Sequence, residues 1–262
     1  MRSFVVSSVA AIGLFGCATA DMTAPDKEPV YLALGDSVAF GYSPLVNGEV
    51  GVQGYPELLA TELGLPVTNA SCPGEASGGF MASDGADNGC RDNRKQYALH
   101  AKYDGTQLQF AIEFLKAHPE TSLVTIDLGA NDAMILKHGC DDSTPCVLGG
   151  FLGMLGSYEH NMDFIFGELR KVYAGDLIAL QIYDPTPTDS LSEYGVERID
   201  TVLGDVAARH GAVVVDGRAA FAPAGNDPCA AGLLIALPSG GCDIHPTHDG
   251  HAKLADAIHA AL

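Results

Sequence analysis

Residues 122–128 read SLVTIDL, a nearly continuous apolar run that is rich in β-branched side chains. Such a run is typical of a strand buried on both faces of a parallel sheet. Similar runs occur along the chain, so we expect a sheet of five strands: Val30–Leu34, Leu65–Asn69, Ser122–Leu128, Asp176–Ile182 and Ala212–Val215. Stretches with helical character separate or follow them: Tyr55–Leu63, Leu108–Ala117, Tyr158–Val172, Ser190–Arg209 and His251–Leu262. Strands that alternate with helices predict an α/β fold whose parallel sheet is covered on both faces.

The composition favours one folded domain and excludes some partners. The chain has 262 residues, of which 47% are hydrophobic and 18% charged, which is enough apolar surface for a packed core. The formal net charge is −19, and such a surface repels phosphate backbones and anionic lipid headgroups. We therefore expect no nucleic-acid binding. We also expect a monomer.

The N-terminus predicts export. Arg2 precedes an uncharged, mostly apolar stretch, so we interpret residues 1–16 as a signal peptide and 17–28 as a tether, which leaves 29–262 for the domain. Leu14-Phe15-Gly16-Cys17 resembles a bacterial lipobox, whereas Ala18-Thr19-Ala20 fits ordinary cleavage and secretion. We favour a lipid anchor on Cys17, which would be the chain's only membrane contact at the cell envelope. The mass of the mature N-terminus distinguishes the two alternatives.

Six cysteines remain after Cys17, and an even number in an exported chain indicates disulfides. Spacing cannot choose among the 15 possible pairings. We expect sequential pairs, because each then closes a loop rich in small or polar residues: Cys72–Cys90, Cys140–Cys146 and Cys229–Cys242.

Four short segments carry candidate functional residues, and three of them directly follow a predicted strand. They are Gly35-Asp36-Ser37, Asn69 to Gly74, Gly129 to Asp132, and Cys242 to His251 before the last helix. Ligand sites in parallel sheets lie beyond the carboxyl ends of the strands. Each segment taken alone is also explained by a turn, a helix cap or a surface histidine.

Together, the phrases LALGDSVAFGY, TNASCPGE, LVTIDLGANDA and DIHPTHDGH resemble the SGNH hydrolases, also called the GDSL esterase and lipase family. The resemblance runs from about Val30 to the C-terminus and implies a flavodoxin-like three-layer α/β/α sandwich. It also implies a nucleophile at Ser37, a general base at His245, and an oxyanion hole formed by Ser37, Gly74 and Asn131. No cofactor or metal is implied, and the substrate would be a small-molecule or lipid ester.

One position departs from the family pattern. The common family acid lies three residues before the histidine, where this chain has Cys242. Asp243 lies two residues before it, and we assign Asp243 as the acid that orients His245. A backbone carbonyl is the alternative.

Two other functions stay open at this stage. His245, His248, Asp249 and His251 form a cluster with metal-ligand chemistry, as in a metal-dependent hydrolase. The chain is alternatively a binding lipoprotein that has lost catalysis.

Three long stretches look irregular: Glu75–Gly105, Gly139–Ser157 and Gly217–Gly241. We expect them to build pocket walls. Within the second stretch, Val147–Leu155 (VLGGFLGML) fits either an acyl-chain pocket or lid, or the start of a helix packed on the core.

Overall fold

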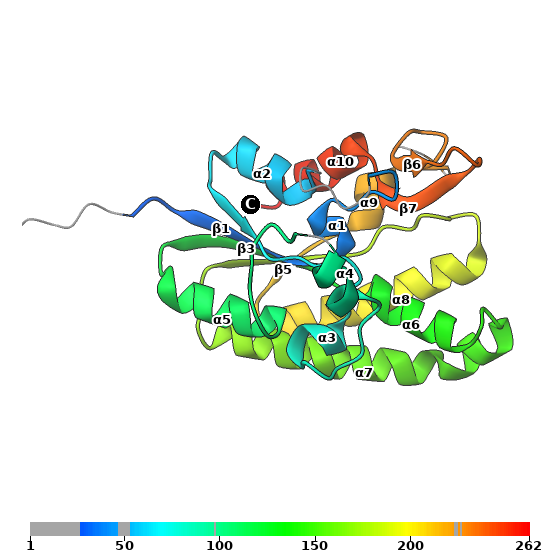
Figure 1. Ribbon diagram of the computed structural model, residues 1–262, viewed down its shortest axis with the longest axis horizontal. Coiled ribbons are helices and arrows are strands. Elements are labelled where there is room, and N and C mark those ends of the chain that lie inside the picture. The colour runs from blue at the N-terminus through cyan, green and yellow to red at the C-terminus, as the bar shows by residue number, and fades with distance from the viewer. Residues whose placement is uncertain (1–26, 47–52, 97, 223–224, 226) are drawn as a thin grey trace, which may run out of the picture.

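The computed structural model describes residues 27–46, 53–96, 98–222, 225 and 227–262 (Figure 1). The predicted signal peptide, Cys17 and most of the tether lie outside these residues. In the part of the chain that is described, no helix is both long and apolar enough to span a bilayer.

A five-stranded, all-parallel sheet forms the centre of the protein, in the order β2-β1-β3-β4-β5. The strands are β1 (Val30–Gly35), β2 (Val67–Asn69), β3 (Thr121–Asp127), β4 (Asp176–Leu180) and β5 (Val213–Val215). All five lie within about two residues of the predicted runs. Their apolar side chains fill both faces, as expected for a sheet covered on both sides.

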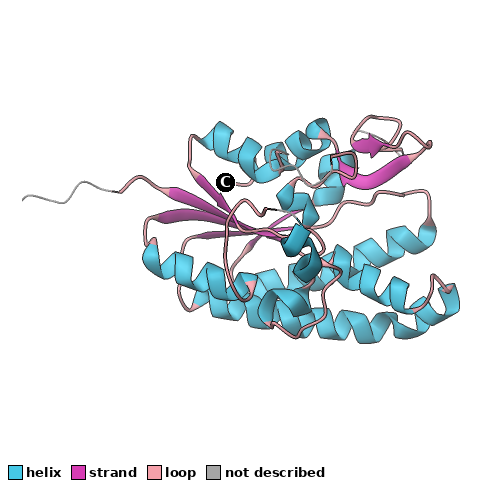
Figure 2. Ribbon diagram, viewed as in Figure 1, coloured by secondary structure: helices cyan, strands magenta, loops and turns pink. Residues whose placement is uncertain are grey.

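Helices form a layer on each side of the sheet, as Figure 2 shows. Leu32 and Leu34 of β1 pack with α5 (Gln107–Ala117), α7 (Thr144–Arg170) and α8 (Ser190–Arg209). Tyr31 and Ala33, on the opposite face, pack with α1 (Ser37–Phe40), α2 (Tyr55–Leu63), α9 (Gly217–Phe221) and α10 (His248–His259). The predicted three-layer α/β/α sandwich is confirmed.

The strand order reverses between β1 and β3, because β2 lies on one side of β1 and β3 to β5 lie on the other. Parallel sheets bind ligands at such a switch point, outside the carboxyl ends of the strands. The segments that follow β1 and β3 carry Ser37 and Asn131. The topology therefore brings two of the predicted site residues together.

A second, two-stranded sheet was not predicted. β6 (Leu234–Ala236) pairs antiparallel with β7 (Cys242–Pro246) and lies apart from the main sheet (Figure 1). β7 carries Asp243 and His245, so these two side chains come from a hairpin rather than from a turn.

The expectation that Gly139–Ser157 is irregular is wrong. Apart from a short turn after α6 (Ala130–Gly139), this stretch is the first half of helix α7. Phe151 and Leu155 are buried in the core, while Leu148 and Leu152 are exposed. Val147–Leu155 is thus a core-packed helix start, and none of its residues lines the cavity described below.

Three disulfides close loops around the sheet. They join Cys72 to Cys90, Cys140 to Cys146 and Cys229 to Cys242, which is the sequential pairing that we expected. The first joins the segment before α3 (Ser77–Met81) to the first residue of α4 (Cys90–Gln96). The last ties the β6–β7 hairpin to the loop before it.

Candidate active site

The Ser37 turn is built by its neighbour Asp36. The Asp36 side chain caps α1 by accepting the Val38 N–H at 2.9 Å, which places Ser37 at the first helical position. There the free amides and the positive end of the peptide dipoles favour a developing negative charge. The sequence alternatives for Ser37 included an N-cap role, and the structure gives that role to Asp36.

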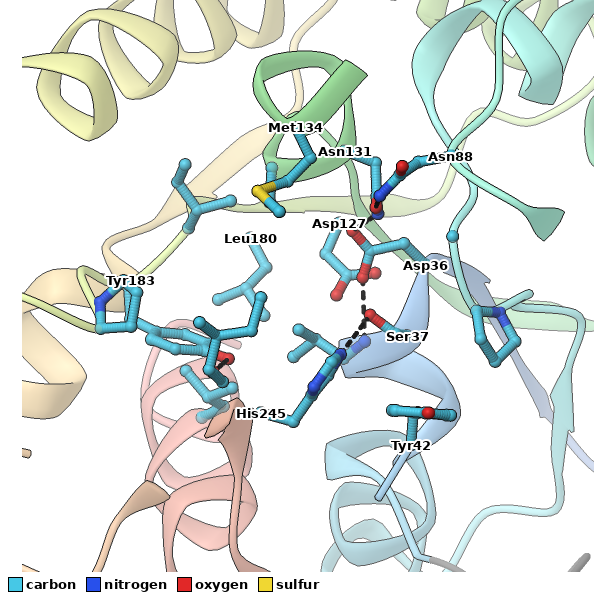
Figure 3. A pocket seen from close by; sticks show the side chains of 18 of the residues that line it. Asp36, Ser37, Tyr42, Asn88, Asp127, Asn131, Met134, Leu180, Tyr183 and His245 are labelled. Atoms are coloured by element: carbon cyan, nitrogen blue, oxygen red, sulfur yellow. Dashed lines mark hydrogen bonds between the residues drawn. The ribbon is translucent and has the colours of Figure 1, made fainter. Parts of the chain in front are cut away.

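His245 faces Ser37 from the β6–β7 hairpin (Figure 3). Its Nε2 lies 2.9 Å from Oγ of Ser37, and its Nδ1 contacts Oδ1 of Asp243. The same carboxylate oxygen accepts the backbone N–H of His245 at 3.0 Å. Asp243 and His245 are two residues apart on one strand, so their side chains share a face. The hydrogen bond from His245 is the largest of the effects that lower the pKa of Asp243, so the acid stays ionised.

Two tyrosines hold the hairpin against the rest of the site. Tyr183 lies in the segment after β4, and its hydroxyl donates to the carbonyl of Ile244 at 2.7 Å. The Tyr42 ring lies 4.8 Å from the imidazole of His245, centroid to centroid. Neither tyrosine was predicted as a site residue, although Tyr183 follows a strand, as the residues in three of the predicted segments do.

Asn131 lies at the start of α6, where it is 7% exposed. Its Nδ2 donates to Oδ2 of Asp36 at 2.9 Å, and its Oδ1 accepts from Nδ2 of Asn88 at 2.9 Å. These two contacts fix which way the amide points. Asp36 therefore orients both the Ser37 helix and the Asn131 side chain.

Gly74 approaches the same place with its backbone. Its φ is +85°, and an added Cβ would lie 2.5 Å from the carbonyl oxygen of Asn88. Asn88 N–H in turn donates to the Gly74 carbonyl at 2.8 Å. The loop is thus packed so tightly that only glycine fits this position.

Two buried carboxyls, Asp36 and Asp127, lie side by side next to Ser37 (Figure 3). Burial raises the pKa of Asp36 to about 6, although the hydrogen bonds from Val38 and Asn131 lower it. Burial, and then the charge of Asp36, raise the pKa of Asp127 well above its ordinary value. Asp127 packs against Gly35, where an added Cβ would lie 1.6 Å from its Oδ1. The glycine before Asp36 thus makes room for this second carboxyl.

Ser37, Gly74, Asn131 and His245 all line one cavity of about 280 Å³. Its polar side includes Asn88 and Asn93. Its apolar lining includes side chains from α6, the end of β4, the loop after β4, the hairpin and α10: Met134, Leu180, Ile182, Tyr183, Pro185, Ile244 and Leu254. The cavity can hold a substrate that has an apolar part next to the Ser37 hydroxyl.

The proposed histidine cluster does not converge. His251 is buried within α10 and burial lowers its pKa to about 3, whereas His248 and Asp249 are exposed. His245 points at Ser37 instead. Within residues 27–262, apart from the undescribed gaps, no three His, Cys, Asp or Glu side chains are grouped as metal ligands.

The fold and this site together define a GDSL-type hydrolase. The sequence profile of the GDSL-like lipase/acylhydrolase family matches residues 33–253, and the chain belongs to this family. Comparison with curated protein sequences gives no match.

Solved structures with the same fold are distant in sequence. Phospholipase A1 from Streptomyces albidoflavus is 18% identical with a TM-score of 0.60, covering 90% of this chain and 100% of that one. An extracellular lipase from Streptomyces rimosus is 18% identical with a TM-score of 0.58, covering 89% and 100%. A catalytic mutant of an acetylxylan esterase from Geobacillus stearothermophilus is 19% identical with a TM-score of 0.57, covering 89% and 93%.

Proposed function

We propose that the protein is an exported serine esterase that hydrolyses carboxylic esters through an acyl-enzyme on Ser37. The observation that carries this proposal is the 2.9 Å contact between Oγ of Ser37 and Nε2 of His245, with Asp243 on the other ring nitrogen. A nucleophile, a base and a group that orients the base are the parts that acyl transfer needs.

The reaction follows from these positions. His245 takes the proton of Ser37 as Oγ attacks the ester carbonyl, and Asp243 stabilises the imidazolium that forms. His245 then gives that proton to the leaving alcohol as the C–O bond breaks. Water, activated by His245 in the same way, releases the acyl group as a carboxylic acid.

Three donors meet the oxyanion of the tetrahedral intermediate in this proposal. They are the backbone N–H groups of Ser37 and Gly74 and the second N–H of the Asn131 amide, whose first N–H is held by Asp36. All three residues line the same cavity. Its apolar side supports lipid or simple carboxylic esters as the substrate class.

Export and a lipid anchor on Cys17 remain part of the proposal. The signal-peptide pattern and the three disulfides support export, because disulfides persist in oxidising compartments. The lipobox-like residues before Cys17 support the anchor.

A serine-directed phosphonate tests the proposed class of enzyme. We expect a p-nitrophenyl phosphonate to abolish hydrolysis of a p-nitrophenyl ester, and mass spectrometry to locate the adduct on the peptide that contains Ser37. A chelator should leave the rate unchanged. Inhibition by the chelator, together with resistance to the phosphonate, would favour the metal-dependent alternative.

Asp243→Asn tests the acid. The asparagine keeps the size of the side chain but cannot hold His245 in the same tautomer or stabilise its cation, so we expect kcat to fall by about 10²–10⁴-fold. The measurement is kcat for a p-nitrophenyl ester at pH 7–8. If most of the activity remains, a backbone carbonyl orients His245 and the site is a dyad.

A further inference from the structure

Gln107 is a buried polar residue that the proposed mechanism does not use. It is the first residue of α5 and is fully buried. The start of this helix is capped without it, since the Thr106 hydroxyl accepts the N–H of Gln109 at 3.1 Å. The Gln107 amide is therefore available for another purpose.

That amide binds both backbone groups of Gly35. Oε1 of Gln107 accepts the Gly35 N–H at 2.6 Å, and Nε2 donates to the Gly35 carbonyl at 3.0 Å. Gly35 ends β1 and stands two residues before Ser37. A planar amide that pairs with both groups of one residue holds the entry to the Ser37 turn in a single orientation.

The same amide reaches the loop that carries Gly74. Nε2 of Gln107 lies 3.4 Å from Oε2 of Glu75, the residue directly after Gly74. A backbone route runs in parallel, because Cys72 N–H donates to the Gly35 carbonyl at 3.1 Å and Glu75 N–H donates to the Cys72 carbonyl at 3.0 Å. Gln107 thus joins the two loops whose N–H groups we assign to the oxyanion.

The surroundings of Glu75 favour the protonated form of its carboxyl. Burial, and then the charge of Asp87, raise its pKa to about 8, while Gln107 and Arg94 act in the opposite direction. At pH 7 its carboxyl is therefore mainly protonated, and Gln107 and Glu75 form a neutral hydrogen-bonded link. A neutral link avoids placing a negative charge close to the oxyanion.

We propose that Gln107 is a positioning residue that sets the spacing between the Ser37 and Gly74 N–H groups, so that both reach one oxyanion. The proposal rests on the function proposed above. Oxyanion donors act only within about 2.7–3.1 Å of the oxygen, and these two come from separate loops. A rigid connection between the loops supplies that accuracy before the substrate arrives.

The test compares two variants of Gln107 with the wild type. Gln107→Leu removes every hydrogen bond of the side chain, and Gln107→Met removes the same amide while keeping an unbranched side chain of similar length. We expect kcat for a p-nitrophenyl ester to fall about tenfold or more while KM changes less than about threefold, because only transition-state contacts are disturbed. Affinity for a boronic acid that mimics the tetrahedral intermediate should fall by a similar factor.

Two controls separate positioning from folding. Gln109→Leu, in the same helical turn, changes an exposed glutamine whose Nε2 contacts Glu113 at 3.1 Å, and kcat should not change. Glu75→Gln keeps a neutral hydrogen-bonding group and should retain kcat within about threefold. Thermal unfolding identifies variants that are folded at the assay temperature. If Gln107→Leu does not fold, Gln107→Met carries the comparison.

Unchanged kcat in folded Gln107 variants would overturn the proposal, as would a rise in KM with constant kcat. A large kcat loss in Glu75→Gln would contradict the neutral link. The proposed function fails separately, if Ser37→Ala retains the wild-type rate.

Discussion

Ser37→Ala is expected to lower kcat for a p-nitrophenyl ester by about 10⁴–10⁶-fold, and His245→Ala by a similar factor. The alanine at position 37 removes the atom that would form the acyl-enzyme. The alanine at position 245 removes the base that lies 2.9 Å from it. The double variant should be no slower than either single one, because the two groups act as one unit.

His248→Ala is the matched control. His248 is three residues from His245 but exposed at the start of α10, so its removal should leave kcat unchanged. Circular dichroism and the unfolding temperature should be close to wild type for all three single variants. If Ser37→Ala keeps more than about 1% of the wild-type kcat, Ser37 is not the nucleophile, because removal of a nucleophile lowers kcat far more than that. A loss in His248→Ala as large as in His245→Ala would revive the metal-site interpretation.

Asn131→Ala is expected to lower kcat by about 10²–10³-fold with little change in KM, which is the usual effect of losing one oxyanion donor. The amide is held on both sides, by Asp36 and by Asn88, so it is already oriented before the substrate binds. Steady-state kinetics on a series of p-nitrophenyl esters gives kcat and KM separately.

Asn88→Ala is the comparison for Asn131→Ala. It removes the donor that holds Oδ1 of Asn131 but keeps the proposed oxyanion donor itself, so its kcat loss should be clearly smaller. A raised KM with normal kcat in Asn131→Ala would mean that the amide binds the substrate in its ground state. The unfolding temperature of Asn131→Ala should be measured too, because this variant leaves the buried Asp36 with one hydrogen bond fewer.

The central sheet could be predicted because its signal is local. Strands that are buried on both faces must be apolar at consecutive positions, and SLVTIDL and the four similar runs have this property. The residues after β1, β2 and β3 were selected by the same logic, and the structure brings Ser37, Gly74 and Asn131 around one cavity with His245. The catalytic roles that we give them stay predictions.

Helix α7 was cut short in the sequence analysis because its first half contains four glycines, which lower helix propensity. A helical signal was nevertheless present. Phe151, Leu155, Tyr158 and Met162 are spaced by four, three and four residues, and all four are buried. Packing of this stripe on the core outweighs the cost of the glycines.

The β6–β7 hairpin gave no usable signal. β6 has three residues, and β7 ends in Pro246, a residue that normally argues against a strand. The strand explains the unusual spacing of the acid, because alternate residues of a strand point the same way. Contacts such as Gln107 with Gly35, 72 residues apart, depend on the complete fold and cannot be read from a local pattern.

Ser37 and His245 belong to parts of the protein that differ in how firmly they are held. Ser37 extends from the central sheet, whereas His245 and Asp243 stand on an accessory ribbon of two short strands, which alone would be only marginally stable. The Cys229–Cys242 disulfide attaches this ribbon to the loop before it, and the Tyr183 hydroxyl attaches it to the segment after β4. A local opening of this ribbon would separate His245 from Ser37 and expose Leu234, while the apolar cluster around Leu32 and Leu34 on the other face of the sheet could stay packed. In the proposed mechanism, such an opening is enough to stop the reaction.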